Sequence, residues 1–307
     1  MLFAVPPLVS AIVLTYRSPK DTLVCVRALL SQSIGDRLEV IVVDNHSDTD
    51  SIGILRIQLP NDPRVRIIET KQNLGYGKGN NFGAQYAVGE YLLIINPDNV
   101  LPPDALEKMV AVMERDLTIG VLAPKLVFPS GEVRDSARAF PSFADVFIKR
   151  TALKYLFPGR IAAYTQSHAL SGGRGLVMHG GRGIACNAPT DASEKQPTRN
   201  APTSREVDWA AGACLLLRRS FYEELGGFDP RFFLFFEDID ICRRTWGKGK
   251  RVVFDASITV ADREHRLSEG GVVTLLTKRT VRWHLMSALK YFWKWRGIVV
   301  DRPPALL

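Results

Sequence analysis

Short apolar runs alternate with amphipathic stretches through the first half of the chain. Four runs rich in Val, Ile and Leu predict buried strands at 9–16, 38–45, 65–69 and 90–96. The stretches between them have helical spacing and predict helices at 20–33, 50–59 and 77–88. Continuous β-branched strands separated by helices are typical of a parallel sheet that is covered on both faces. The pattern therefore predicts an α/β fold.

The second half of the chain is less regular. After a helix expected at about 103–116, VLAPKLVF predicts another strand, and VDWAAGACLLLRRSFYEELGGFD predicts a strand and a helix that ends at Gly226-Gly227. Residues from about 165 to 205 are rich in Gly, Ser, Pro and Arg, and we interpret them as a long flexible insertion. A last helical pattern spans 271–296.

Composition excludes several classes of protein. With 46% hydrophobic and 23% charged residues, the chain is neither disordered nor fibrous. No apolar run reaches the roughly 20 residues that a membrane-spanning helix needs, and the stretch MLFAVPPLVS lacks the features of a signal peptide. The four cysteines are scattered without CxxC spacing, so we expect neither a zinc site nor disulfides, and a cytoplasmic location fits.

The net charge of +8 is concentrated in the C-terminal part of the chain. Residues 241–307 hold 14 Lys and Arg against 5 Asp and Glu, a balance of +9, and the other residues sum to about −1. Such a region can face nucleic acid, anionic lipid or an anionic substrate. A solvated basic surface explains the charge equally well.

Polar residues follow three of the predicted strands, as Thr15-Tyr16, Asp44-Asn45 and Asn96-Pro97-Asp98-Asn99. Ligands of parallel sheets bind beyond the carboxyl ends of the strands, so these residues predict a ligand site. Asp98 is suited to a divalent cation that keeps its other positions for water and phosphate oxygens. Equally, it could cap the helix that begins near Pro103.

The segment NLGYGKGNNFG, residues 73–83, is a glycine-rich turn before a predicted helix. It lacks the G-x-G-x-x-G pattern of dinucleotide-binding proteins, and it does not match a P-loop. The backbone of such a turn can approach a phosphate. A plain tight turn is the simpler explanation of the glycines.

The segment FFLFFEDIDICRR places Glu237, Asp238 and Asp240 directly after four phenylalanines and a leucine. It does not match a calcium loop. On the first turn of a helix these acids point in different directions, so one can work in a cleft while another pairs with Arg243 or Arg244. A carboxylate beside the phenylalanines would be desolvated, which raises its pKa toward that of a useful general base. The helix dipole, which favours acids at an N-terminus, is the alternative explanation.

In this order, the motifs resemble those of the family 2 glycosyltransferases of the GT-A fold, especially a rhamnosyltransferase-like branch that builds bacterial polysaccharides. The match covers most of residues 8–270. It runs through Thr15-Tyr16, DNHSDTD, NLGYGKGNNFG, NPDN, VDWAAGACLLLRR and GGFDPRFFLFFEDIDICRR to a histidine segment near His265. The resemblance implies a Rossmann-like, mostly parallel central sheet flanked by helices. It divides the chain into a nucleotide-sugar-binding half (1–125), an acceptor and catalytic half (126–270), and a basic amphipathic helix with a tail (271–307).

The resemblance implies a donor site in the first half. Thr15, Tyr16 and Asp44 resemble the pocket for the nucleotide base, with Asn73 and Asn81 near the ribose and phosphates. The implied donor is a nucleotide-diphosphate sugar, with dTDP-rhamnose as the first expectation and UDP-linked sugars after it.

The resemblance also implies a divalent cation, Mg²⁺ or Mn²⁺. Asp98 resembles the one acid that remains of a DxD metal motif, because Asn99 stands in place of the second acid. His265 occupies the place of a C-terminal metal or phosphate contact. A solvated histidine between Glu264 and Arg266 is the alternative for this position.

For the reaction, the resemblance implies an inverting transfer of the sugar to a saccharide or lipid-linked saccharide acceptor. Asp238 resembles the catalytic base, Glu237 a neighbour that supports it or binds the acceptor, and Trp209 a wall of the acceptor cleft. Asp240 and the arginines after it are expected to hold the helix. A non-catalytic sugar- or nucleotide-binding protein on the same scaffold is the alternative, although it would need neither Asp98 nor Asp238. A nucleic-acid-binding module would leave the strand-end acids unexplained, so we expect no nucleic acid partner.

Two interpretations of the 271–296 helix stay open. Its aromatic residues include Trp283, Phe292, Trp293 and Trp295. Together with Lys290 and Lys294, they could hold the helix on the cytoplasmic face of a membrane, close to a lipid-linked acceptor. Alternatively, its apolar positions have the spacing of a core helix, which packs against the catalytic part or in a homodimer.

Overall fold

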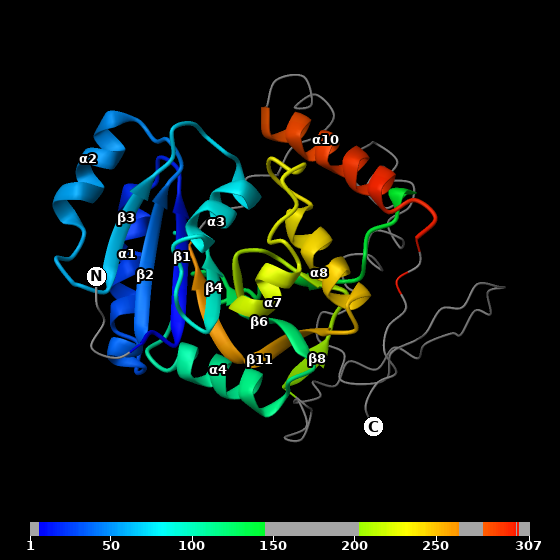
Figure 1. Cartoon of the computed structure of the whole chain (residues 1–307), viewed down its shortest axis with the longest axis horizontal. Helices are drawn as coiled ribbons and strands as arrows, with labels where there is room; N and C mark the ends of the chain where they lie inside the picture. The colour runs from blue at the N-terminus through cyan, green and yellow to red at the C-terminus, as the bar shows by residue number, and fades with distance from the viewer. Residues whose placement is uncertain (1–5, 145–202, 264–278, 299, 301–307) are drawn as a thin grey trace.

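The apolar runs of the first half fold into parallel strands, as their pattern predicts. The strands are β1 (Val9–Thr15), β2 (Leu38–Asp44), β3 (Val65–Glu69) and β4 (Tyr91–Ile95). The helices between them are α1 (Pro19–Leu30), α2 (Thr49–Gln58) and α3 (Tyr76–Ala84), with a short 3-10 turn η1 (Gly35–Arg37). This structure, a computed structural model, describes residues 6–144, 203–263, 279–298 and 300 (Figure 1).

The remaining elements include those predicted for the second half of the chain, and also strands that the sequence pattern did not single out. They are β5 (Asn99–Val100), α4 (Ala105–Arg115), β6 (Ile119–Val127), β7 (Ala137–Arg138), β8 (Ser204–Glu206), β9 (Trp209–Ala210), β10 (Cys214–Arg218), α7 (Arg219–Glu224), α8 (Glu237–Gly247), β11 (Arg251–Asp262) and α10 (Arg279–Lys294). Almost all of the predicted insertion at about 165–205 lies outside the described residues, as do residues 271–278 of the predicted last helix. Within the described residues, no helix is both long and apolar enough to span a bilayer.

Nine strands of the described residues form one sheet in the order β3-β2-β1-β4-β10-β6-β11-β5, with β8 paired to β11. The pairs among β3, β2, β1 and β4 are parallel, and β11 is parallel to β6. Strand β10 runs antiparallel between β4 and β6. The sheet is therefore mostly parallel, as expected, with a reversed strand where the two halves of the chain meet.

Apolar side chains alternate between the two faces of the sheet. In β1, Val9, Ala11 and Val13 pack with apolar residues of α1 and α4, whereas Ile12 and Leu14 pack in the layer that includes α7 and α8. None of these five side chains is more than 8% exposed. Helices therefore cover both faces, as the sequence predicts (Figure 1).

Two glycines let α3 lie close to the sheet. A Cβ on Gly83 would come within 2.7 Å of Ile12 and 2.8 Å of Val43, and a Cβ on Gly79 within 2.5 Å of Leu14. Side chains do not tolerate such approaches in a close-packed interior. Packing against β1 and β2 therefore explains these two glycines of NLGYGKGNNFG without a phosphate.

Helix α10 packs on α8 and on the segment that precedes α8 (Figure 1). Its buried side chains are Val281, Ser287, Ala288 and Tyr291. Lys294 donates to Asp229 Oδ2 at 2.7 Å and pairs with Asp240 Oδ1 at 2.6 Å, and Lys290 donates to the Arg231 carbonyl at 2.9 Å. The packing interpretation therefore holds for one face of the helix. Both lysines make contacts on that face.

Candidate active site

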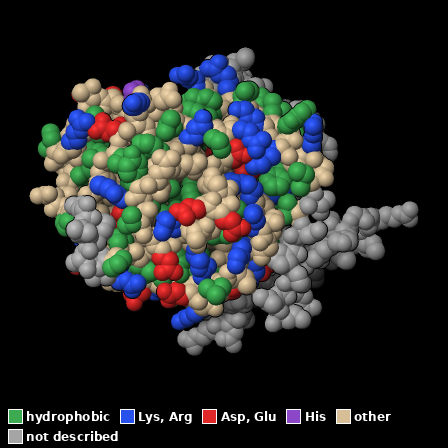
Figure 2. Space-filling view, in the orientation of Figure 1, with side chains coloured by type: hydrophobic (Ala, Val, Ile, Leu, Met, Phe, Trp, Pro, Cys, Tyr) green, Lys and Arg blue, Asp and Glu red, His purple; other side chains and the backbone are tan. Residues whose placement is uncertain are grey.

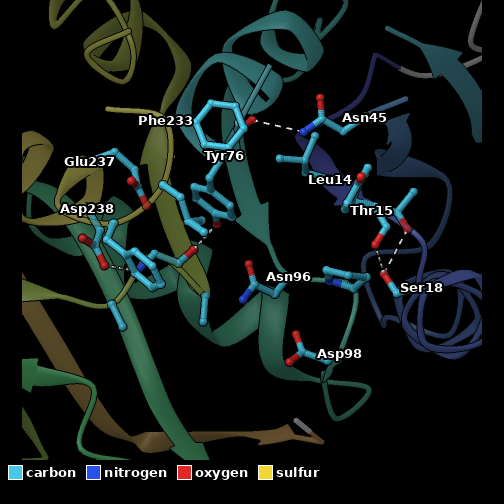
Figure 3. Close-up of a pocket in the computed structure, with 18 of the residues that line it drawn as sticks. Leu14, Thr15, Ser18, Asn45, Tyr76, Asn96, Asp98, Phe233, Glu237 and Asp238 are labelled. Atoms are coloured by element: carbon cyan, nitrogen blue, oxygen red, sulfur yellow. Dashed lines mark hydrogen bonds between the residues drawn. The ribbon is translucent and has the colours of Figure 1, made fainter. Parts of the chain in front are cut away.

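A cavity of about 420 Å³ opens at the carboxyl ends of β1 and β4. The strand ends build one wall, and the start of α8 with the segment before it builds the opposite wall (Figure 3). Six of the residues predicted from the sequence line it, namely Thr15, Tyr16, Asn73, Asp98, Glu237 and Asp238. The structure thus brings residues from both halves of the chain to one cavity.

The strand-end wall is fixed by the side chain of Asn45, which follows β2. Its Nδ2 donates to Asn73 Oδ1 at 3.1 Å and to the Gly75 carbonyl at 3.2 Å, and its Oδ1 accepts from the Leu74 amide at 2.9 Å. These bonds tie the loop at residues 73–75 to the end of the strand. The polar pair Asp44-Asn45 indicated this position in the sequence. The sequence did not indicate that the side-chain amide of Asn45 fixes the neighbouring loop.

Three further polar residues lie at the strand ends. Thr15 is buried, whereas Tyr16 is 44% exposed at the cavity, with the Arg17 guanidinium 5.1 Å from its ring centre. Asp44 is buried and is not among the lining residues. Its Oδ2 accepts from the Ser47 amide at 3.0 Å, and its Oδ1 has no hydrogen-bond partner in the part of the chain that the structure describes. A buried acceptor in this state is costly unless a ligand satisfies it.

The two walls meet at Gly75 and Tyr76. The Tyr76 amide donates to the Phe233 carbonyl at 2.7 Å, and the Tyr76 hydroxyl donates to the Gly212 carbonyl at 2.6 Å. Gly75 has φ +79°, and a Cβ there would lie 2.2 Å from the Phe233 carbonyl oxygen. Burial raises the pKa of Tyr76 well above its usual value, with Glu237 adding to the effect, so the hydroxyl stays a donor. Glycine at position 75 is required by the close approach.

The acids of α8 enter the cavity after an unusual backbone turn. Phe235 and Phe236 have φ angles of +68° and +70°, in the left-handed region that costs a side-chain-bearing residue about 1–2 kcal/mol. Packing holds this conformation, because Phe236 is 3% exposed and its ring centre lies 5.2 Å from that of His284 and 5.4 Å from that of Tyr291. The turn directs the first residues of α8 toward the strand-end wall.

Asp238 is held as an acceptor at the cavity wall. Its Oδ2 accepts from the Gly212 amide at 3.2 Å, and its Oδ1 accepts from the Ile239 amide at 2.8 Å. Burial raises the pKa of Asp238 above its usual value, while these amides and the positive charge of Arg134 oppose the rise. The carboxylate is therefore more basic than an exposed one and still held in a fixed orientation.

Glu237 differs from Asp238 in its surroundings. It is 5% exposed, and its Oε2 has no hydrogen-bond partner among the described residues. Burial raises the pKa of Glu237 well above its usual value, and the negative charge of Asp238 raises it further. Burial therefore favours the protonated form of Glu237 more strongly than that of Asp238.

Asp240 and the basic residues around it fix the helix, as the sequence predicts. The fully buried carboxylate accepts from Arg244 Nε at 2.8 Å and from Trp295 Nε1 at 2.9 Å, besides its pair with Lys294. Arg244 also donates to the carbonyls of Leu225 and Gly227 at 2.7 and 2.8 Å. The third acid of the segment is therefore part of the scaffold and not of the cavity.

Asp98 lies in the loop after β4, lines the cavity and is 5% exposed. It does not cap the following helix, because the N-cap of α4 is Asp104. No group of three or more His, Cys, Asp or Glu side chains among the described residues is arranged to hold a metal ion. A single carboxylate of this kind is suited to a cation that takes its other ligands from phosphate and water. His265, the other predicted metal contact, lies outside the described residues.

Comparison with known proteins places the chain in a family. The model of glycosyl transferase family 2 matches residues 10–174. N-acetylglucosaminyl-diphospho-decaprenol L-rhamnosyltransferase of Mycobacterium tuberculosis is 30% identical over 260 residues, which cover 81% of this chain and 74% of the relative. The chain belongs to glycosyltransferase family 2. The O-antigen biosynthesis protein RfbC of Myxococcus xanthus is 29% identical over 83% of this chain, although the match spans 17% of RfbC.

Solved structures of glycosyltransferases share the fold. GalNAc-T7 with UDP, GalNAc and Mn²⁺ superposes with a TM-score of 0.59 at 14% identity, over 96% of this chain and 49% of the GalNAc-T7 chain. TarS of S. aureus superposes with a TM-score of 0.50 at 16% identity, over 83% of this chain and 36% of TarS. The chain therefore has the GT-A fold expected from its motifs.

Besides Asp44, two residues predicted for the site of this glycosyltransferase are not among the lining residues. Asn81 Oδ1 accepts from the Tyr222 hydroxyl at 2.6 Å and from the Phe228 amide at 2.8 Å, and its Nδ2 donates to the Phe228 carbonyl at 2.8 Å. Trp209 is 8% exposed, and its Nε1 donates to the Ala139 carbonyl at 2.8 Å. Neither lines the cavity, because each side chain is used to fix a neighbouring loop.

Arg134 and Trp283 are among the lining residues of the glycosyltransferase that were not singled out as site residues. Arg134 lines the cavity and forms an ion pair with Asp262, which is fully buried. Trp283 reaches the cavity from α10, and its ring centre lies 4.6 Å from that of Phe233. In the sequence, only the cluster of aromatic residues in the last helix drew attention to Trp283. No local sequence pattern indicated that Arg134 belongs to the site.

Proposed function

We propose that this family 2 enzyme transfers a sugar with inversion from a nucleotide-diphosphate sugar to a saccharide or lipid-linked saccharide in bacterial cell-surface polysaccharide synthesis. Rhamnose from dTDP-rhamnose is the first candidate, because the mycobacterial relative is a rhamnosyltransferase. The observation that carries the proposal is the fixed Asp238 carboxylate across the cavity from a strand-end site.

The strand-end wall supplies the donor site in this proposal. Thr15, Tyr16 and Asn73 line it, and Asn45 holds its loop. The unsatisfied Oδ1 of Asp44 can accept from an N–H group of the nucleobase once the base is bound. A base N–H would remove the cost of that buried acceptor, so nucleotide binding and the local structure support each other.

Asp238 acts as the general base in the proposed reaction. It takes the proton of the acceptor hydroxyl as that oxygen bonds to the anomeric carbon, on the face opposite the leaving group. The bond from that carbon to the diphosphate oxygen breaks, and the nucleoside diphosphate leaves with the bonding electrons. The Gly212 and Ile239 amides keep the carboxylate oriented, and burial makes it a stronger base. Burial favours the protonated form of Glu237, and in that form its carboxyl can donate a hydrogen bond to the acceptor.

The residues present fit a divalent cation, Mg²⁺ or Mn²⁺, at Asp98. This carboxylate lines the cavity at the end of β4 and is not used to cap α4. The GalNAc-T7 structure that shares the fold contains Mn²⁺. When bound, such a cation supplies positive charge next to the diphosphate that leaves.

The test measures donor binding and transfer separately. A thermal-shift screen of nucleotide sugars with and without Mn²⁺ identifies the donor, since a ligand at 100 times its Kd stabilises by about 2.7 kcal/mol. The best donor is then incubated with a short-chain polyprenyl-diphospho-N-acetylglucosamine, and the product is examined by NMR. We expect release of nucleoside diphosphate and the opposite anomeric configuration. A retained configuration would refute the inversion, and binding without any release would favour the non-catalytic alternative.

A further inference from the structure

The outward face of α10 is apolar and carries no packing partner among the described residues. Its exposed side chains are Leu285 (42%), Met286 (55%), Leu289 (49%) and Trp293 (69%). Their spacing places all four on one side of the helix, opposite the buried Ser287, Ala288 and Tyr291. Single exposed apolar residues are ordinary, whereas a row of four large ones on one helix marks an interaction surface.

Arginines border this row. Arg279, Arg282 and Arg296 are exposed on the same helix and just beyond it. The Arg296 guanidinium lies 3.7 Å from the ring centre of Trp293. From Arg279 to Ile298 the sequence contains no Asp or Glu. Figure 2 shows the hydrophobic and basic side chains mixed along this edge of the molecule.

We propose that this surface, defined by Leu285, Met286, Leu289 and Trp293 with the bordering arginines, docks on an anionic phospholipid bilayer. An apolar row with tryptophan sinks to the level of the headgroups, and arginines beside it pair with anionic lipid. A nucleic acid would leave the Leu and Met side chains in water, so charge alone does not describe the surface. The inner face of the helix is already occupied by α8, which leaves the outer face for the partner.

Docking through α10 would hold the cavity close to the surface of the bilayer. Trp283 belongs to the same helix and lines the cavity, so a bilayer against α10 lies close to the opening. If the proposed function is correct, the acceptor hydroxyl of a lipid-linked saccharide is then presented within reach of Asp238. The docking itself does not depend on the reaction, because it needs only the residues of α10.

Co-sedimentation of the full chain with vesicles tests the proposal. Vesicles of phosphatidylcholine with phosphatidylglycerol are compared with pure phosphatidylcholine, at low and high salt and without donor. We expect binding only to the anionic vesicles, with about a fivefold loss of affinity for each exposed arginine removed. The variant Leu285→Ser/Leu289→Ser/Trp293→Ser should bind at least tenfold more weakly. The control Ile57→Ser/Leu117→Ser, at residues 83% and 67% exposed elsewhere, should bind as wild type does.

Several results would overturn the proposal. One is a chain that stays in the supernatant with anionic vesicles at low salt, and another is a triple variant that binds as well as wild type. Sedimentation velocity without lipid decides the remaining case: a wild-type dimer that the triple variant converts to monomer, with no vesicle binding, would make the surface a contact between two copies. A circular dichroism melt confirms that each variant folds. Transfer to a water-soluble acceptor distinguishes a failure of docking from a failure of the proposed function.

Discussion

Replacing Asp238 by Asn tests the proposed base and leaves most of its contacts in place. The Asn carbonyl oxygen can still accept from the Gly212 amide, so the wall of the cavity should keep its shape. The proton acceptor is lost, and removal of a general base reduces the rate by about 10²–10⁴, which corresponds to roughly 3–5.5 kcal/mol in the barrier. We expect kcat to fall by this factor while the Kd of the nucleoside diphosphate changes by less than threefold, which is about 0.7 kcal/mol.

The fold should not suffer from the same change. A carboxyl whose pKa is raised on folding binds its proton more tightly in the folded state. Its ionisation therefore lowers stability as the pH rises from the usual carboxyl pKa through the raised value. Burial raises the pKa of Asp238, so Asn removes an unfavourable charge, and the Tm at pH 7.5 should be equal to or above that of wild type. In wild type, kcat should fall as the pH drops through the raised pKa, because the protonated carboxyl cannot accept the proton.

The matched control is Glu237→Gln, since burial favours the protonated form of Glu237 and Gln has a similar shape. We expect kcat to fall less than tenfold for this variant. The two variants are compared by initial rates of nucleoside diphosphate release at saturating donor, with the Tm measured for each. More than about a tenth of wild-type turnover in Asp238→Asn, or a larger loss in Glu237→Gln, would show that the roles in this pair are assigned wrongly.

Three other changes test the site and its supports. Asp98→Ala should weaken binding of nucleoside diphosphate in the presence of Mn²⁺ and leave the Tm within a few degrees; calorimetry that gives equal affinities would make Asp98 a turn residue. Gly75→Ala should lower the stability of the fold by clearly more than Gly35→Ala, which should cost about 1 kcal/mol, because of these two positions only 75 brings a Cβ against a carbonyl oxygen. Equal losses of Tm in the two variants would contradict this expectation. Lys294→Met should destabilise by about 1–3 kcal/mol in urea unfolding, because Asp240 loses a charged donor; an unchanged midpoint would show that Arg244 and Trp295 suffice.

The strand ends and the acids of α8 could be predicted because local patterns specify them. A parallel sheet brings the residues after its strands to one edge, which places Thr15 and Asp98 together whatever the details of packing. The segment with Glu237 and Asp238 could be recognised because acidic residues directly follow a run of apolar ones. Its left-handed turn at Phe235 and Phe236 was beyond prediction, because it depends on rings that pack from another helix.

The predicted residues that do not line the cavity could not have been recognised from sequence. Asn81 sits in a polar, glycine-rich motif of which only Asn73, Gly75 and Tyr76 reach the cavity, and the direction of its side chain follows from the bonds to Tyr222 and Phe228. Sequence spacing gives the face of a helix but not which groups lie opposite. Likewise, Arg134 is held at the cavity by an ion pair with Asp262, which lies 128 positions later in the chain. A local sequence pattern cannot indicate a pairing between residues so far apart.

The contacts of α10 also bear on how the chain is made. Trp295 is 55 positions after Asp240, so at 5–20 residues per second a ribosome adds it about 3–11 seconds later. During this interval the emerging polypeptide can complete β1 to β4 and the nucleotide side of the cavity, while Asp240 lacks two of its partners and the aromatic rings before α8 stay in water. Under the proposed function, the nascent protein thus completes its donor side first and its acceptor side last. Ribosome-bound chains that stop short of α10 should bind nucleotide and show no transfer.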